Sequence, residues 1–180
     1  MNLAVLAPQW MTFALLALLA LAAAEDAVRL RISNLISLAV LLLGIGAMWA
    51  VGFRLSLWEN LLVLAAVLAV GTWLFSSGRM GGGDIKLFAA TGLWFDLEGA
   101  LLLLVSVALA GGLLALFILA IRMVSWSEGA KERVLVLRPK GGIPYGIAIA
   151  AGAALAVMVA QAAATTADPL TNWSAVPKAR

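Results

Sequence analysis

Acid–base chemistry in this chain is confined to few side chains, because the 180 residues include neither Cys nor His. Their absence excludes disulfides, thiol nucleophiles, Ser-His-Asp triads and zinc sites of the Cys/His type. Four aspartates remain as candidates: Asp26, Asp84, Asp96 and Asp168. Asp84 directly follows Gly81-Gly82-Gly83. Glycines permit the close approach of another backbone and leave N–H groups accessible, so this segment is typical of a binding or catalytic site.

Two carboxylates on one side of a molecule can hydrolyse a peptide bond. At close range they cannot both ionise, so the pair holds one proton. The ionised partner then removes a proton from water, while the protonated partner polarises the peptide carbonyl. Whether any two aspartates of this chain can meet depends on the elements that carry them.

The composition indicates an integral membrane protein. The chain is 64% hydrophobic and 12% charged, with a mean hydropathy of +1.09, whereas soluble domains are about 45–50% apolar and about 25% charged. A soluble fold could not bury so much apolar surface. We therefore expect an all-α polytopic bundle forming one domain over residues 1–180. The net charge of +3 is what cytoplasmic membrane loops alone produce and does not indicate nucleic-acid binding.

Uncharged stretches predict the membrane crossings, each of which needs about 20 mostly apolar residues. The fourth stretch is short, and its helix is expected to hold Asp84 at membrane depth. The first uncharged stretch has no Lys or Arg up to residue 24. A signal peptide would begin with a basic segment, so this favours a retained helix over a cleaved signal peptide. The predicted helices cover about 3–24, 33–53, 60–77, 84–96, 100–121 and 143–167, followed by an irregular tail, 168–180.

The basic residues predict the orientation. Nine of the twelve Lys and Arg residues lie in or beside the connections between helices one and two, three and four, and five and six. Because cytoplasmic loops are rich in Lys and Arg, these connections are expected in the cytoplasm and both termini outside. The nine are Arg29, Arg31, Arg79, Lys86, Arg122, Lys131, Arg133, Arg138 and Lys140; the other three are Arg54, Lys178 and Arg180.

The number of crossings before each aspartate separates the four into two pairs. Asp26 follows one crossing and Asp84 three, so both face the cytoplasm, whereas Asp96 and Asp168 follow an even number and face outward. Only Asp26 and Asp84 can meet. Twelve residues of helix between Asp84 and Asp96 cover about 18 Å of a hydrocarbon core of about 30 Å. Asp84 is therefore expected below the cytoplasmic surface, where a carboxylate is costly and usually functional.

Simpler interpretations of the same residues remain open. Asp84 could cap a helix after a glycine turn, and Asp26 could be a solvated loop charge paired with Arg29 or Arg31. Lys86 lies on the opposite side of a helix from Asp84, where it could extend to the membrane interface. A transporter or proton-conducting subunit would also use intramembrane Asp and Lys, and a structural assembly subunit would tolerate loss of the carboxylates.

Three motifs, in order along the chain, resemble those of the prepilin leader peptidases, which are membrane aspartic endopeptidases. Residues 80–87, Met-Gly-Gly-Gly-Asp-Ile-Lys-Leu, resemble the family's Gly-x-Gly-Asp-x-Lys signature. Residues 26–34 are similar to its Asp, basic residues and Ile-Pro-Asn, with Ser33 in place of Pro. Ser33 can cap the following helix instead. Residues 143–152, from Ile-Pro-Tyr-Gly to Gly152, are similar to the start of the family's last helix.

The resemblance implies a catalytic pair, Asp26 and Asp84, with Gly81, Gly83 and Lys86 binding or positioning the substrate. It implies no metal and no cofactor. The substrate would be a prepilin whose cationic leader is cut at the cytoplasmic side of the bacterial inner membrane, with lipid and the pilus assembly machinery as further partners.

Departures from the longer members of the family indicate a subtype. Members that also N-methylate the mature pilin carry an extra cytoplasmic region, often with Cys-x-x-Cys pairs, which this chain lacks. It resembles the short, peptidase-only members of tight-adherence (Flp-type) pilus systems. Intramembrane proteases share Gly-x-Gly-Asp, but they usually pair it with an aspartate inside a preceding helix, whereas Asp26 is expected at a loop edge.

The charge asymmetry leads to a test of topology. A single cysteine introduced at Ala130, in the predicted cytoplasmic loop from Arg122 to Gly142, should react with thiol reagents only from the cytoplasmic side. The native chain contributes no background because it has no cysteine. Labelling of position 130 only from the outside would overturn the predicted map and, with it, the pairing of Asp26 with Asp84.

Overall fold

A computed structural model describes residues 1–52, 54–123 and 142–167, and all regular structure within these ranges is helical. The order and number of the long elements follow the sequence prediction, with differences at their ends. The helices are α1 (Leu3–Leu6), α2 (Gln9–Arg29), α3 (Asn34–Val51), α4 (Leu57–Ser76), α5 (Gly82–Gly92), α6 (Leu97–Met123) and α8 (Tyr145–Ala167).

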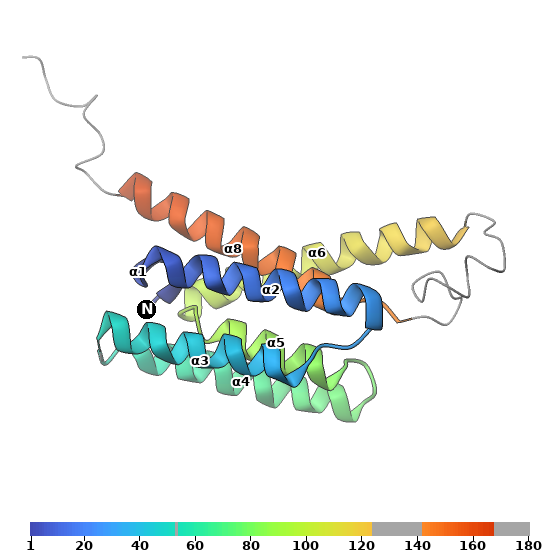
Figure 1. Ribbon diagram of the computed structural model, residues 1–180, viewed down its shortest axis with the longest axis horizontal. Coiled ribbons are helices and arrows are strands. Elements are labelled where there is room, and N and C mark those ends of the chain that lie inside the picture. The colour runs from blue at the N-terminus through green and yellow to red at the C-terminus, as the bar shows by residue number, and fades with distance from the viewer. Residues whose placement is uncertain (53, 124–141, 168–180) are drawn as a thin grey trace, which may run out of the picture.

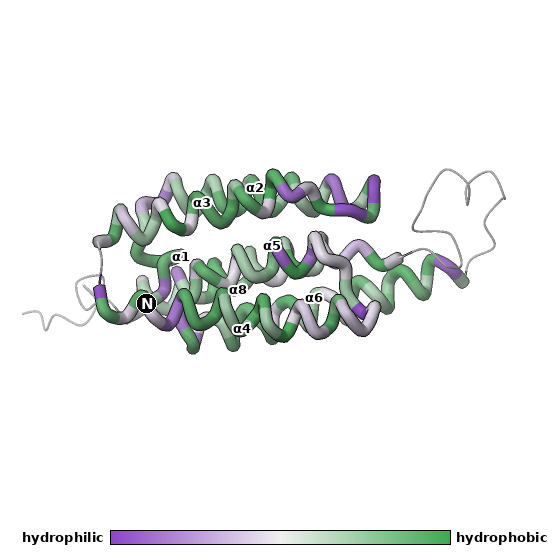
Figure 2. Tube along the Cα trace, turned by 90° about the horizontal axis from the view of Figure 1, so that it is seen from below, coloured by the Kyte–Doolittle hydropathy of each residue, from purple (hydrophilic) through white to green (hydrophobic). Residues whose placement is uncertain are grey.

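In Figure 1, α2, α6 and α8 lie in the upper part of the bundle and α3, α4 and α5 in the lower part; Figure 2 shows the same bundle from below. The long helix α8 packs against both α6 and α2, while the short α5 packs against α3, α4 and α8. The core between them is built from fully buried apolar side chains, among them Leu15, Leu19, Leu87 and Ile149. Thus α5 occupies the interior of the bundle, where its side chains are surrounded by longer helices.

Five helices, α2, α3, α4, α6 and α8, are long and apolar enough to cross a membrane. Hydrophilic residues gather toward the ends of the bundle and hydrophobic residues lie between them (Figure 2). Large apolar side chains such as Trp49, Leu113 and Phe117 are more than three-fifths exposed, as expected for a surface that faces lipid. The chain is a multi-pass membrane protein, and the prediction of an all-α polytopic bundle is confirmed.

The first predicted helix, 3–24, differs from the structure near its start and at its end. A four-residue helix, α1, precedes Pro8, and α2 begins after this proline, which cannot donate a backbone hydrogen bond. At its other end α2 continues past residue 24 to Arg29, and Leu30 then ends it in the left-handed conformation with φ 50°. Asp26 therefore lies in the last turn of a helix rather than at a loop edge.

The fourth predicted helix is shorter than expected and begins earlier. The 11 residues of α5 end at Gly92, too few to cross the hydrocarbon core, which requires about 20. Trp94 and Phe95, which follow α5 directly, are fully buried. The indole N–H of Trp94 faces the carbonyl of Val40 in α3 at 3.4 Å. The link between α5 and α6 is thus part of the core.

Asn60 holds this link in place. Its side-chain amide nitrogen lies 2.9 Å from the carbonyl oxygens of Met1 and Leu93 and 3.1 Å from that of Phe95. Carbonyl oxygens without a helical partner must be satisfied when they are buried. One fully buried asparagine contacts three such carbonyls, which belong to the N-terminus and to the α5–α6 link.

Ion pairs mark the same end of the bundle. The N-terminal ammonium lies 3.4 Å from Asp96 and 3.6 Å from Glu59. The part of α2 from Gln9 to Asp26 separates this end from Asp26 by about 25 Å at 1.5 Å per residue. Asp96 therefore shares an end with the N-terminus, away from Asp26, as expected, although α5, which lies between Asp84 and Asp96, is too short to count as a crossing by itself. Asp168 and the tail lie outside the described ranges, as does most of the loop from Arg122 to Gly142.

Replacement of Asn60 tests this anchor. Asn60→Leu keeps the volume but leaves buried carbonyls without a donor, at about 1–3 kcal/mol for each unsatisfied group. Thermal unfolding in detergent, followed by tryptophan fluorescence, should show a clearly lower Tm. Thr72→Val is the matched control, because Thr72 is exposed and bonds only within its own helix, to Leu68. Equal Tm values for the two variants would contradict the proposed role of Asn60.

Candidate active site

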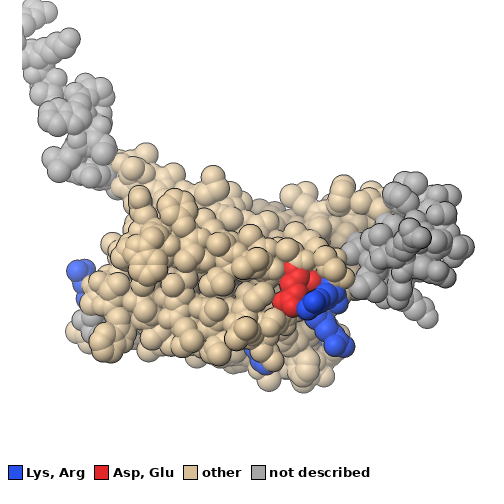
Figure 3. Space-filling view, viewed as in Figure 1, with Lys and Arg blue, Asp and Glu red and all other residues tan. Residues whose placement is uncertain are grey.

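Asp26 and Asp84 lie at the same end of the bundle, on different helices. Asp26, in the last turn of α2, is only 3% exposed. Asp84 is the third residue of α5 and is partly buried. Figure 3 shows acidic side chains gathered in one place on the face in view, beside basic side chains and near the end of α2. The remaining described surface of that face is almost entirely uncharged.

The carboxylate of Asp26 is held by the start of α8. The backbone N–H of Gly146 donates to Asp26 Oδ2 at 2.7 Å. The first N–H groups of a helix have no partner within it and carry partial positive charge, so they stabilise a carboxylate. A Cβ atom on Gly146 would lie 2.9 Å from both Cβ and Oδ2 of Asp26. The glycine is therefore what allows this approach, and the alternative of a solvated Asp26 is wrong.

The carboxylate of Asp84 is held within its own helix start. Gly81 is the N-cap of α5, and its backbone N–H hydrogen-bonds the carboxylate of Asp84. This bond from an N-cap N–H to a side chain three residues later is half of a capping box. A Cβ on Gly81 would lie 2.7 Å from Asp84 Oδ2. Asp84 thus contributes to capping from the first turn but is not itself the N-cap.

The two carboxyl groups interact electrostatically. Asp84 belongs to α5, which is not one of the five candidate membrane spans. Burial and then the charge of Asp26 raise the pKa of Asp84 to about 6, against the lowering effect of the Gly81 bond. A raised pKa means that Asp84 holds its proton over a pH range in which an ordinary aspartate is ionised.

Ile32 connects the two helix starts. A Cβ on Gly83 would lie 3.0 Å from the carbonyl oxygen of Ile32, and one on Gly146 would lie 2.9 Å from Cδ1 of Ile32. One residue of the α2–α3 connection therefore touches both α5, which carries Asp84, and α8, which holds Asp26. The chain's own backbone occupies the close approach that Gly83 permits.

Glu25 fixes the connection that contains Ile32, a role the sequence analysis missed. Its Oε2 accepts the backbone N–H of Ser33 at 2.9 Å, and its Oε1 lies 3.3 Å from Arg29 Nη1. The Ser33 hydroxyl oxygen accepts the N–H of Leu35, so Ser33 caps α3 as predicted. The bond between Glu25 and Ser33 joins residues eight positions apart. This spacing matches neither a helix nor a strand repeat, so no sequence pattern predicts the bond.

Lys86 ties α5 to the first residue of α3. Its Nζ donates to Asn34 Oδ1 at 2.9 Å. Lys86 is two residues from Asp84, and its side chain reaches a different neighbour, Asn34. Together with the contact of Gly83 with Ile32, this bond holds α5 against the α2–α3 connection.

The site offers two carboxylates in unequal environments. Both carboxylates accept a backbone N–H, from Gly146 and Gly81 respectively. Asp26 is nearly inaccessible, whereas Asp84 is more accessible. Such a pair can share a proton and activate water. Within the described ranges, no group of three or more Asp and Glu side chains could hold a metal ion.

Comparison with protein families matches residues 13–116 to the type IV leader peptidase family. The match covers more than half of the chain and includes both aspartates and the three glycines. The chain therefore belongs to this family, which supports a leader peptidase-like function and a prepilin as the kind of substrate. Comparisons with curated proteins and with solved structures gave no match.

The family match bears on the alternatives that the sequence left open. It favours a peptidase over a transporter or an assembly subunit. Against the intramembrane proteases, the predicted distinction was the place of Asp26 at a loop edge, and that argument is wrong because Asp26 lies inside α2. The family match, rather than the position of Asp26, is what favours a leader peptidase.

The contact of Gly146 with Asp26 leads to a mutational test. Gly146→Ala places a methyl group within 2.9 Å of Asp26, so the carboxylate must move and lose its hydrogen bond. We expect prepilin cleavage to fall at least tenfold, as measured by the mass change of the substrate. Gly46→Ala is the control, because a Cβ there meets only Met11 Cε at 3.6 Å. Equal cleavage by both variants would show that the position of Asp26 does not depend on Gly146.

Proposed function

We propose that this protein is a membrane aspartic endopeptidase that removes the leader from type IV-type prepilins, with Asp26 and Asp84 as its catalytic pair. The observation that carries the proposal is the convergence of these two carboxyl groups at one end of the bundle, close enough for the charge of Asp26 to act on Asp84. The family match supplies the kind of reaction and substrate.

The unequal environments assign a role to each carboxyl group. The Gly146 N–H stabilises ionised Asp26, which takes a proton from water as the water oxygen attacks the scissile carbonyl carbon. Protonated Asp84 donates to the carbonyl oxygen, giving a neutral tetrahedral gem-diol. Asp26 then passes its proton to the amide nitrogen, and Asp84 recovers a proton from one hydroxyl as the C–N bond breaks. The shared proton is thereby restored.

Gly81, Gly83 and Lys86 act as positioning residues in this proposal. Gly81 leaves room for the carboxylate of Asp84, and Gly83 allows Ile32 to lie against α5. Lys86 fixes α5 to Asn34. These contacts hold Asp84 relative to Asp26, and geometry of this kind supplies much of the catalytic advantage of an enzyme site.

We assign the site to the cytoplasmic side of the bacterial inner membrane. Nine of twelve basic residues lie at or beside connections on the side of Asp26 and Asp84, which is the pattern of cytoplasmic loops. The chain has no Cys-x-x-Cys pair. We therefore propose the peptidase-only, Flp-type subclass, without N-methyltransferase activity and working alongside the pilus assembly machinery.

Replacement of each aspartate tests the proposal directly. Asn is nearly isosteric with Asp but can neither act as base nor hold the shared proton. Asp26→Asn and Asp84→Asn should each abolish processing of a prepilin by the purified enzyme, since general acid–base groups are worth about 10²–10⁴-fold or more. Chelators should have no effect.

Asp96→Asn is the matched control for the dyad. Asp96 lies at the opposite end of the bundle, paired with the N-terminus, and an Asn there can still accept the N–H of Gly99 as Asp96 does. Cleavage at the wild-type rate is expected. Wild-type cleavage by either dyad variant, or inhibition by chelation, would show that the aspartic mechanism is wrong.

A further inference from the structure

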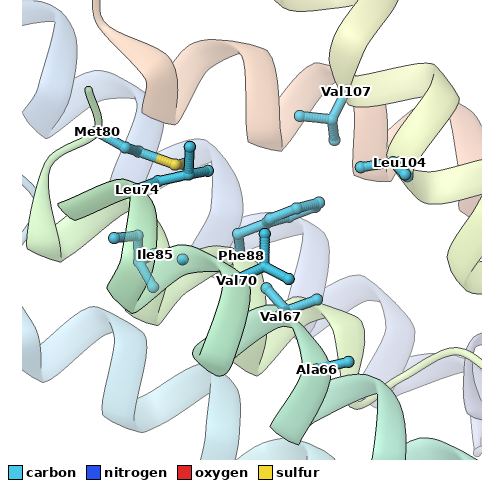
Figure 4. Close-up of a pocket in the computed structure, with 10 residues that line it drawn as sticks. Ala66, Val67, Val70, Leu74, Met80, Ile85, Phe88, Leu104 and Val107 are labelled. Carbon is cyan, nitrogen blue, oxygen red and sulfur yellow. The ribbon is translucent and has the colours of Figure 1, made fainter. Parts of the chain in front are cut away.

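A continuous apolar groove runs along α6 with α5 as its floor. Its other wall is α4 in two of the hollows that form it, and Ile143 with the start of α8 in the third. Three adjoining hollows of about 290, 420 and 380 Å³ share lining residues, and Phe88 and Leu104 border all three. Figure 4 shows the first of them, with Phe88 of α5 between side chains of α4 and α6. We call this feature the α4–α6 groove. Besides Phe88 and Leu104, its main lining residues are Val67, Met80, Ile85 and Val107.

The groove is open to the side where lipid would lie. Of its lining residues, Val70, Leu101 and Leu104 are each more than half exposed. All side chains of the first two hollows are apolar, and the third adds only Tyr145 as a polar one. Because no charged group lies along it, the groove fits an apolar occupant and penalises a polar one.

The length of the groove matches a membrane-spanning helix. Along α6 the lining runs from Leu97 to Ala115, about 27 Å at 1.5 Å per residue. The hydrocarbon core of a bilayer is about 30 Å thick. A single apolar helix lying in the groove could therefore cross most of the membrane while in contact with α4, α5 and α6.

At one end, the groove is lined by two residues that directly precede the glycines bonded to the aspartates. Met80 lines the groove and directly precedes Gly81, whose N–H bonds Asp84. Tyr145 also lines it and directly precedes Gly146, whose N–H bonds Asp26. A helix seated in the groove would thus present the residues at its own end to the carboxyl pair.

We infer that the α4–α6 groove is the docking site for the apolar helix of the prepilin, with the scissile peptide bond at the end of this helix lying between Asp26 and Asp84. The inference rests on the proposed function and deepens it. The groove binds the part of the substrate that is not cut, so it contributes to binding equally in the ground state and the transition state.

Gly112 provides the sharpest test of this inference. It is exposed, lines the groove in α6, and a Cβ there meets nothing within 4 Å. Gly112→Phe therefore fills the groove without a clash inside the protein, and it raises rather than lowers helix propensity. Ala120→Phe is the matched control, because Ala120 is exposed on the same helix and lines none of the three hollows.

Steady-state cleavage of a full prepilin by the purified enzyme in lipid nanodiscs should show at least a tenfold higher KM for Gly112→Phe, with kcat little changed. Ala120→Phe should match the wild type. A soluble peptide containing the leader and the cleavage site, but no apolar helix, should be cleaved equally by wild type and Gly112→Phe. An unchanged KM for the full prepilin would overturn the inference. This holds even if Gly112→Phe altered lipid binding or self-association.

Disulfide trapping gives an independent readout. In an Asp84→Asn background, Gly112→Cys should cross-link to a cysteine placed in the apolar helix of the prepilin, and Ala120→Cys should not. Cross-linking at 120 alone would place the substrate elsewhere and overturn the inference. Failure of the wild-type enzyme to cleave any prepilin would instead refute the proposed function, so the two failures are distinguishable.

Discussion

Ile32 lies between two helix starts, and the meeting of the two aspartates depends on that packing. Its carbonyl group lies against Gly83 of α5 and its side chain against Gly146 of α8. A side chain at either glycine would separate the α2–α3 connection from a helix that carries or holds a carboxyl group. Glu25 keeps this connection folded back by bonding to Ser33. The glycines of the site therefore act first as spacers for the protein's own backbone.

The opposite end of the bundle is held by a different kind of constraint. Asn60 bonds to three backbone carbonyls, and the N-terminal ammonium pairs with Glu59 and Asp96. These bonds fix the end of α5 and the start of α6 in the core. A short helix that is anchored at its far end and tied to Asn34 by Lys86 near its start can hold Asp84 below the protein surface without itself crossing the membrane.

Under the proposed function, the bundle keeps the carboxyl pair that cuts the substrate apart from the groove that binds its apolar helix. Polar contacts are concentrated at the two ends of the bundle, whereas the α4–α6 groove is almost wholly apolar along its length. For the proposed prepilin substrate, such an arrangement would hold an apolar helix in the groove and present the peptide bond at its end to the carboxyl pair. The groove and the carboxyl pair meet where Met80 and Tyr145 each precede a glycine whose N–H holds an aspartate.

The sequence by itself determined the membrane class and the helical architecture, and it predicted that Asp26 and Asp84 lie at the same end of the bundle and Asp96 at the other. The hydropathy of a segment and the charge of a loop depend only on the residues within them, so both can be calculated without knowing how the helices pack. Only the tertiary structure decided that Asp26 lies inside α2, that Trp94 and Phe95 are buried, and that Glu25, Asn60 and Gly146 hold the ends in place. Each of these depends on contacts between residues far apart in the chain, or on where a helix ends against its neighbours, and no local pattern encodes them.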